Sequence, residues 1–289
     1  MNKITIMTDS NSGITQAQAK ELGIKVVPMP FMIDEVEYFE DINLSQDQFY
    51  EKLIGNCKIS TSQPSPDTVM NMWDEALKES EEVVYIPMSS GLSSSYRTAL
   101  LLSEDYDERV QVVNNQRISV TMRQSVFDAM ELAKKGFTGK EIRRILEDDK
   151  FNSSIYIMID TLEYLKRGGR LTPAAALLGQ FLKIKPVLQI QGEKLDTFAK
   201  VRTISQAKYT MLNQMLKDVT ERFGCPKTGK GMKIMVAHTQ NLEAALQFKR
   251  EIEEMFPECG EVYVDCLSLS VSCHIGPGAL AIACTKDMI

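Results

Sequence analysis

The 289-residue sequence contains only two histidines and no pair of cysteines in a C-x-x-C spacing. Its six cysteines, at positions 57, 225, 259, 266, 273 and 284, do not resemble the paired ligands of a zinc site, so we predict no metal and no cofactor. Reduced cysteines are usual in cytoplasmic proteins, and a cytoplasmic location is the expectation.

The chain also lacks a long apolar run. Its N-terminus turns polar at Thr8-Asp9-Ser10, so we expect no signal peptide, and no segment approaches the length of a membrane span. A formal net charge of -6 argues against nucleic acid or an anionic membrane as the main partner, although transient membrane contact is compatible with it. Hydrophobic residues are 44% and charged residues 25%, which is typical of a soluble globular protein.

Nucleotide-binding loops are missing as well. No G-x-G-x-x-G occurs, and Gly224–Lys230 spells most of a phosphate-binding P-loop but has Gly231 in place of the final Ser/Thr. That stretch follows a predicted helix and precedes a predicted strand, which is the reverse of the order that a P-loop requires. We therefore reject it.

Strands alternate with helices in the first half, which predicts a doubly wound parallel sheet in an N-terminal α/β domain of residues 1–153. Two prolines and a short β-rich segment predict a small antiparallel insertion at about residues 24–44. The second half, residues 154–289, mixes a hairpin at 184–200 with helices, including one of small residues at 173–178, and reads as an α+β domain. Ala174-Ala175-Ala176 could equally leave room for a tunnel or allow close helix packing.

Two serine-rich segments stand where ligand sites form. In the segment 59–66, Ser65 and Pro66 suit the start of a helix, whereas Thr61 and Ser62 exceed what a cap needs. The segment 87–96 directly follows a predicted buried strand and opens a helix. The carboxyl ends of parallel strands carry ligand sites, and a helix N-terminus suits an anion. Here anion binding and a solvated capping loop are about equally supported.

Three further motifs carry charge next to glycine or a strand end. A Gly168-Gly169 pair permits a tight turn that would direct Arg170, and Arg202 ends a predicted hairpin strand. His274 precedes a Gly-Pro-Gly turn, where backbone can approach a ligand closely. A solvated basic turn and a structural histidine are the plain alternatives, and His238 is interpreted as structural.

Taken together and in order, these motifs resemble the DegV family. The resemblance rests on a set of segments that runs from end to end of the chain: Thr8-Asp9-Ser10, Thr61-Ser62-Gln63-Pro64-Ser65, Ser89-Ser90-Gly91-Leu92-Ser93, Asp160-Thr161-Leu162-Glu163-Tyr164-Leu165, Gly168-Gly169-Arg170, Ile184-Lys185-Pro186 and His274-Ile275-Gly276-Pro277-Gly278.

The resemblance implies a fatty-acid-binding protein that is not itself an enzyme, like the FakB-like subunit of a bacterial fatty acid kinase system. A long-chain fatty acid would be its ligand. A separate fatty acid kinase subunit would phosphorylate the acid to an acyl phosphate, a phospholipid precursor. Carried over by motif, Thr61, Ser93 and Ser94 with His274 would hold the carboxylate. Arg170 and Arg202 would face the phosphate and the kinase, and His274 would help to hold negative charge.

The sequence departs from the family pattern at two places. Ser94 stands where the family often has glycine, and Thr203-Ile204 follow Arg202 where the family often has glycine and lysines.

There are also two alternative functions. A hydrolase would use Ser93 and His274, with an acid such as Asp9 orienting the histidine, but Gly91-Leu92-Ser93-Ser94-Ser95 lacks the second glycine of G-x-S-x-G. A nucleotide-binding regulator or kinase lacks an acceptable phosphate loop.

Overall fold

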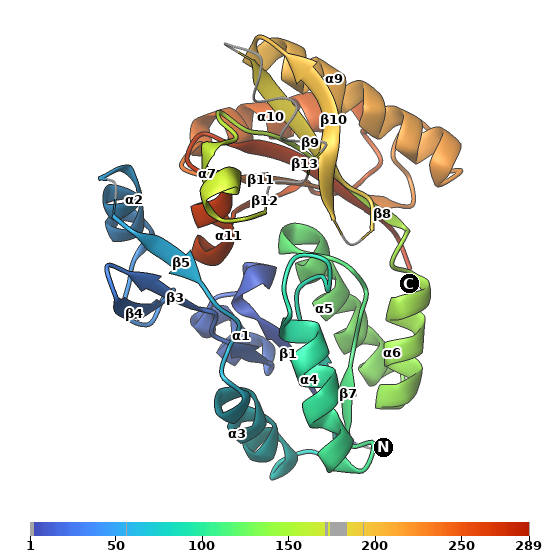
Figure 1. Ribbon diagram of the computed structural model, residues 1–289. Helices are drawn as coiled ribbons and strands as arrows, with labels where there is room; N and C mark the ends of the chain where they lie inside the picture. The colour runs from blue at the N-terminus through green and yellow to red at the C-terminus, as the bar shows by residue number, and fades with distance from the viewer. Residues whose placement is uncertain (1–2, 56, 171–172, 174–183, 193, 289) are drawn as a thin grey trace. The chain divides into compact units, whose positions relative to one another are not determined.

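A computed structural model describes residues 3–55, 57–170, 173, 184–192 and 194–288 (Figure 1). The chain divides into unit 1, residues 1–150 with 268–270, and unit 2, residues 151–267 with 271–289. The sequence placed one boundary at 153/154. The structure differs in that the division falls at 150/151 and a three-residue segment near the C-terminus belongs to unit 1.

Unit 1 is built on a four-stranded parallel sheet in the order β2-β1-β6-β7. Its strands are β1 (Ile4–Asp9), β2 (Lys25–Val27), β6 (Glu82–Ile86) and β7 (Val110–Val112). Its helices are α1 (Gln16–Leu22), α3 (Pro66–Leu77), α4 (Ser95–Ser103), α5 (Ser119–Lys134) and α6 (Gly139–Asp148), with 3-10 turns at Ser10–Ser12 and Glu104–Tyr106.

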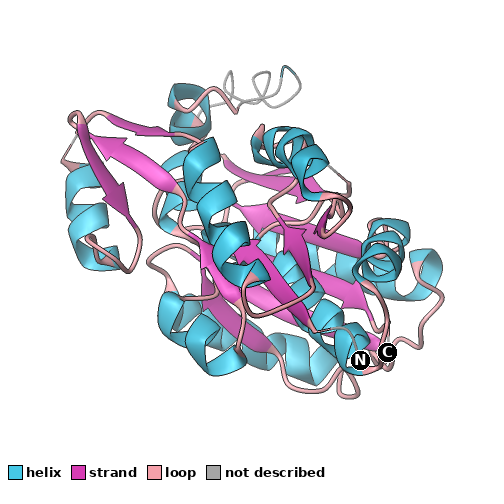
Figure 2. Cartoon of the chain, turned by 90° about the horizontal axis from the view of Figure 1, so that it is seen from below, coloured by secondary structure: helices cyan, strands magenta, loops and turns pink. Residues whose placement is uncertain are grey.

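Helices cover both faces of this sheet, which confirms the doubly wound prediction. Successive residues of a strand point to opposite faces. Tyr85 of β6 packs in one cluster with Trp73 of α3 and Ala99 of α4, whereas Val84 lies beside Gly139 of α6. Figure 2 shows helices lying alongside the strands.

The antiparallel insertion is a separate three-stranded sheet in the order β4-β3-β5. It contains β3 (Pro30–Ile33), β4 (Val36–Phe39), α2 (Gln46–Ile54) and β5 (Ile59–Thr61). The predicted range of about 24–44 differs from it at both ends. β2 pairs in parallel with β1 and so belongs to the main sheet, while β5 joins β3 from beyond α2.

Local sequence signals fix the helix starts. Thr15, Ser45 and Thr138 each form a capping box with the Gln or Glu three residues later. Ser65 caps α3 through the Thr68 amide, and Pro66 occupies the first turn, as predicted.

Unit 2 contains a six-stranded mixed sheet in the order β10-β9-β8-β13-β11-β12, in which only β11 and β12 pair in parallel. The strands are β8 (Ser153–Met158), β9 (Lys185–Ile190), β10 (Leu195–Val201), β11 (Met232–His238), β12 (Tyr263–Cys266) and β13 (Leu280–Lys286). The helices are α7 (Glu163–Arg167), α9 (Ile204–Lys217) with a π-helical end at Asp218–Arg222, α10 (Leu242–Met255) and α11 (Leu269–Ile275). This α+β arrangement confirms the predicted class.

The core of unit 2 lies between its sheet and the two long helices, where Met211 of α9 and Phe248 of α10 pack with Ile282 of β13. The short helices α7 and α11 were not predicted. Residues 174–178 of the predicted small-residue helix, including Ala174-Ala175-Ala176, lie outside the described residues. Within the described ranges no helix is long and apolar enough to cross a membrane.

Candidate functional site

The sheet of unit 1 reverses its strand order between β1 and β6. The chain leaves β1 for β2 on one side and later continues from β6 to β7 on the other. At such a switch point the connections diverge beyond the carboxyl ends of the strands and leave room for a ligand. Asp9 ends β1 there, and the serine loop Ser89–Ser95 follows β6.

The serine loop folds back on its own first residue. The amides of Leu92 and Ser93 donate to the Ser89 carbonyl at 3.0 and 3.2 Å. The hydroxyls of Ser93 and Ser95 lie 2.8 Å apart, and Ser93 is half-buried. Ser94 is exposed and occupies the N-cap position of α4 without a capping hydrogen bond. The loop therefore presents hydroxyls at the N-terminus of a helix, an arrangement suited to an anion.

A buried carboxylate holds the base of this loop. Asp9 is fully buried and accepts hydrogen bonds from the Met88 amide at 2.9 Å and from the Asn11 backbone amide at 2.9 Å. Burial raises the pKa of Asp9 from 3.8 to about 6, and the N–H donors oppose that rise. Both carboxylate oxygens are thus engaged by Met88 and Asn11. The hydrolase alternative needs that carboxylate to orient a histidine.

Thr61 lies at the end of β5, opposite Phe31 of β3. Two residues later the Gln63 side chain accepts a hydrogen bond from the Thr98 hydroxyl of α4 at 3.0 Å. The segment that follows Thr61 is therefore tied to the helix that the serine loop opens. Thr61 and Ser93 share unit 1.

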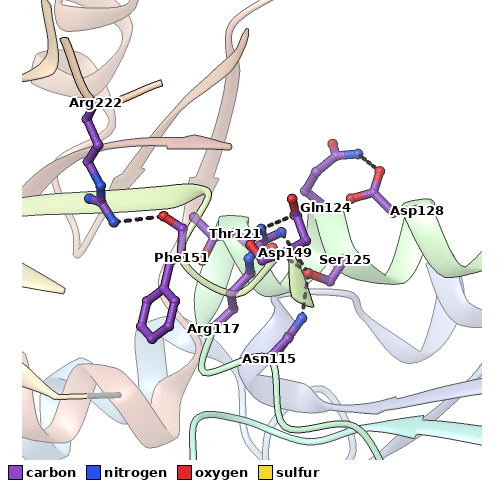
Figure 3. A network of polar contacts seen from close by, with 9 residues as sticks. All are labelled: Asn115, Arg117, Thr121, Gln124, Ser125, Asp128, Asp149, Phe151 and Arg222. Atoms are coloured by element: carbon purple, nitrogen blue, oxygen red, sulfur yellow. Dashed lines mark hydrogen bonds and ion pairs between the residues drawn. The ribbon is translucent and has the colours of Figure 1, made fainter. Parts of the chain in front are cut away.

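Arg117 also supports the serine loop, although no sequence motif singled it out. Its carbonyl accepts from the Ser89 amide at 2.9 Å. Its guanidinium, 1% exposed, donates to the Ser125 hydroxyl at 3.0 Å and forms a 2.6 Å ion pair with Asp149 (Figure 3). Gln116 and Ser119, on either side, have φ values of 56° and 54°, in the left-handed region. The buried ion pair of Arg117 with Asp149 thus holds a loop whose backbone is left-handed at two positions. The Arg117 carbonyl of this loop supports Ser89.

In unit 2, His274 lies against the backbone of Gly168. A Cβ at Gly168 would stand 1.9 Å from the imidazole Nδ1, so this position requires glycine. Gly169 next to it has φ +67°, as the Gly-Gly turn predicted. A Cβ at Gly276 would stand 2.2 Å from the Tyr164 ring, so the Gly-Pro-Gly turn packs against the same helix, α7.

Arg170 places a positive charge near this histidine, which disfavours the protonated imidazole. Its side chain is exposed and donates to the Gly168 carbonyl at 2.7 Å. Burial, and secondarily the positive charge of Arg170, lower the pKa of His274 to about 4. His274 is therefore neutral at neutral pH. The expectation that His274 helps to hold negative charge stays a prediction, and a neutral imidazole would do so by donating a hydrogen bond.

Arg202 and His238 lie elsewhere in unit 2. Arg202 is exposed just beyond β10, and its amide donates to the Gln206 side chain at 3.0 Å, next to the N-cap Thr203 of α9. His238, at the end of β11, accepts from the Asn241 amide at 3.3 Å, and burial lowers its pKa. This contact agrees with the structural role assigned to His238.

The predicted site residues divide between the two units. Thr61, Ser93 and Ser94 lie in unit 1, and His274, Arg170 and Arg202 lie in unit 2, where the structure brings His274 and Arg170 together.

No sequence signal pointed to Asn11, Arg117 and Asp149, because their partners are distant in the chain. Among the described residues no group of three or more His, Cys, Asp or Glu side chains could hold a metal ion.

Comparisons with known proteins agree with this architecture over its whole length. The structure of a DegV family protein from Thermus thermophilus, named for its fatty acid binding, matches with a TM-score of 0.89 and 26% identity, covering 98% of this chain and 99% of the other. DegV of Bacillus subtilis, called a fatty acid binding protein, matches with a TM-score of 0.86 and 28% identity, covering 99% and 100%.

Sequence comparison gives the same assignment. A DegV domain-containing protein of Halalkalibacterium halodurans is 30% identical over 287 residues, which is 98% of each chain. The family model described as "Uncharacterised protein, DegV family" matches residues 3–287. The chain therefore belongs to the DegV family.

Proposed function

We propose that this protein is a cytoplasmic carrier that binds one long-chain fatty acid and presents it to a separate fatty acid kinase, which phosphorylates the carboxylate. The observation that carries the proposal is the serine loop at the end of β6, which opens α4 at the switch point of the sheet. The fatty acid binding of the Thermus thermophilus and Bacillus subtilis relatives supports it.

The two ends of the ligand have different tasks. A sixteen-carbon acid has about fourteen CH₂ groups, and burial at about 0.8 kcal/mol each offers on the order of 11 kcal/mol before entropic costs. The tail therefore supplies affinity. Hydrogen bonds from Ser93 and Thr61, with Ser94 nearby and His274 as a neutral donor, orient the carboxylate. Arg170 and Arg202 stabilise the added charge of the acyl phosphate.

Ligand extraction tests this proposal directly. Purified protein is denatured, extracted and analysed by mass spectrometry, and protein stripped of lipid is titrated with palmitate. We expect about one long-chain fatty acid per chain. Protein that is empty as purified and also fails to bind added palmitate would refute the function.

A further inference from the structure

The Gly-Pro-Gly turn of residues 276–278 is held to the sheet of unit 2 by the buried Thr239. This threonine directly follows β11 and is 0% exposed. Its hydroxyl donates to the Gly276 carbonyl at 2.6 Å and accepts from the Ala279 amide at 2.9 Å. Its backbone amide donates to the Ala279 carbonyl at 3.2 Å, and its carbonyl accepts from the Gly278 amide at 2.8 Å. The side chain and the backbone of Thr239 thus bind both ends of the turn.

Asn241 holds the same turn through its side chain. Its Nδ2 donates to the Gly278 carbonyl at 3.1 Å, and its backbone amide donates to Nδ1 of His238 at 3.3 Å. His238 ends β11 and lies opposite Leu280, the first residue of β13, in the antiparallel pair of these strands. The turn is therefore anchored to a firmly paired end of the sheet.

This turn also ends α11, the helix that carries His274. α11 runs from Leu269 to Ile275, and the Gly276 amide closes its last turn by donating to the Ser272 carbonyl at 2.8 Å. Gly276 has a φ of +79°, the left-handed conformation that is common where a helix ends. His274 lies between Ser272 and Gly276. The Thr239 hydroxyl therefore fixes the carbonyl of the residue whose amide closes the turn that contains His274.

The opposite side of this helix end packs closely against α7 and its C-terminal end. A Cβ at Gly276 would stand 2.2 Å from the Tyr164 ring, and Nδ1 of His274 lies against Gly168. The Gly168 amide in turn donates to the Tyr164 carbonyl at 2.9 Å. All of these residues belong to unit 2. Because close-packed contacts change with small displacements, a helix end released from Thr239 would alter the contact between His274 and Gly168.

We propose that Thr239, assisted by Asn241, is a positioning residue that fixes the C-terminal end of α11 and through it the imidazole of His274. The consequence for ligand binding rests on the proposed function, in which His274 donates a hydrogen bond to the carboxylate. The positioning itself does not rest on that function, because every contact that produces it lies within unit 2.

The experiment follows His274 by proton NMR in protein stripped of lipid. The chain has two histidines, so His238→Gln assigns the two imidazole signals. Thr239→Val removes the hydroxyl and nearly keeps the shape, whereas Thr239→Ser keeps the hydroxyl and loses a methyl group. Asn241→Ala is a milder change that removes one donor. Thr285→Val is the matched control, because Thr285 is also buried, at 1% exposed, toward the other end of β13.

Burial is the main cause of the lowered pKa of His274, and the charge of Arg170 is the second. A looser helix end admits water to the imidazole, so Thr239→Val should move the His274 signal and raise its pKa by about one unit toward the ordinary value of about 6.5. Asn241→Ala should move the signal in the same direction by less. Thr239→Ser and Thr285→Val should leave it in place. Palmitate affinity should fall about tenfold in Thr239→Val and less than about twofold in Thr239→Ser.

A folded Thr239→Val protein whose His274 signal and pKa match those of the native chain would overturn the inference. A Thr239→Ser protein that behaves like Thr239→Val would also overturn it, since the hydroxyl would then not be the cause. If Thr239→Val does not fold, an unmoved His274 signal in Asn241→Ala overturns it alone. A native protein that binds no palmitate would refute the proposed function instead, and the His274 signals would still decide the positioning role.

Discussion

His274 and Gly168 are in such close contact that a methyl group on Gly168 would stand 1.9 Å from Nδ1 of the imidazole. Gly168 has an ordinary φ of -78°, so its backbone would accept alanine without strain. The requirement for glycine at this position is therefore steric, and it comes from the histidine.

Gly168→Ala should displace His274. We expect a loss of about 1–3 kcal/mol in the free energy of unfolding, measured with urea, and a moved His274 signal in NMR. Gly169→Ala is the matched control, because a Cβ there meets open space and only the φ of +67° is strained. It should cost about 1–2 kcal/mol and leave the His274 signal in place. An unmoved signal in folded Gly168→Ala protein would contradict the contact.

The protonation of His274 should appear in the pH dependence of stability. Its pKa is about 4 in the folded protein against 6.5 ordinarily, so the unfolded chain binds more protons between these values. His274 therefore stabilises the fold fully above pH 6.5, and that stability is lost as the pH falls toward 4. The full effect is on the order of 3 kcal/mol.

Comparison of native protein with His274→Gln isolates this contribution from that of Asp9. The pKa of Asp9 is raised to about 6, so its effect has the opposite sign, and stability falls as the pH rises from 3.8 to about 6. Asp9 is present in both proteins and cancels in the difference. Urea unfolding between pH 4 and 7 should give curves that diverge toward neutral pH. Parallel curves would mean that His274 titrates normally.

The hydroxyls of Ser93 and Thr61 are predicted to recognise the carboxylate rather than the acyl chain. Ser93→Ala and Thr61→Ala should each weaken palmitate binding by about 1.5–3 kcal/mol, the strength of a hydrogen bond to a charged group. Methyl palmitate should lose much less. Isothermal titration calorimetry with both ligands measures the difference.

Ser103→Ala is the control for these variants. Ser103 ends the same helix, α4, and its hydroxyl bonds to the Leu100 carbonyl at 2.7 Å. It should leave both affinities unchanged. Equal losses for acid and ester in Ser93→Ala would show that the hydroxyl does not recognise the charge.

The sequence predicted the elements of this fold well where the signal is local. Ser65-Pro66 begins α3, and the serine segment follows a buried strand, as their patterns indicated. Strand β5, which ends at Thr61, and helix α11, which contains His274, were by contrast not predicted.

The contacts that support those residues could not be predicted in this way. Asn11 meets Ser270 across 259 positions, and Arg117 meets Asp149 across 32, so no local pattern connects either pair. The lowered pKa of His274 is another feature that local sequence does not reveal. It depends on burial, which charge spacing along the chain does not reveal.

The last prediction separates a carrier from an enzyme, and it depends on the exposed arginines. With a fatty acid kinase and ATP added, the bound acid should become an acyl phosphate. Arg170→Ala should reduce that rate about tenfold or more while changing palmitate affinity less than about threefold, because only the product carries the extra negative charge. Arg202→Ala should act in the same direction. Arg167→Ala is the matched control, since Arg167 lies 4.8 Å from the ring centre of Tyr164 in the same segment.

Without kinase, the chain should hydrolyse neither acyl esters nor ATP. A nucleophilic serine needs a base that accepts its proton and an acid that orients the base. The Ser93 hydroxyl instead lies 2.8 Å from that of Ser95, and the oxygens of Asp9 are engaged by Met88 and Asn11. His274, with a pKa of about 4, would moreover be a weak base. Ester hydrolysis that proceeds without kinase and disappears in Ser93→Ala would replace the carrier with a hydrolase. An equal loss of acid affinity and acyl phosphate formation in Arg170→Ala would instead make Arg170 a binding residue.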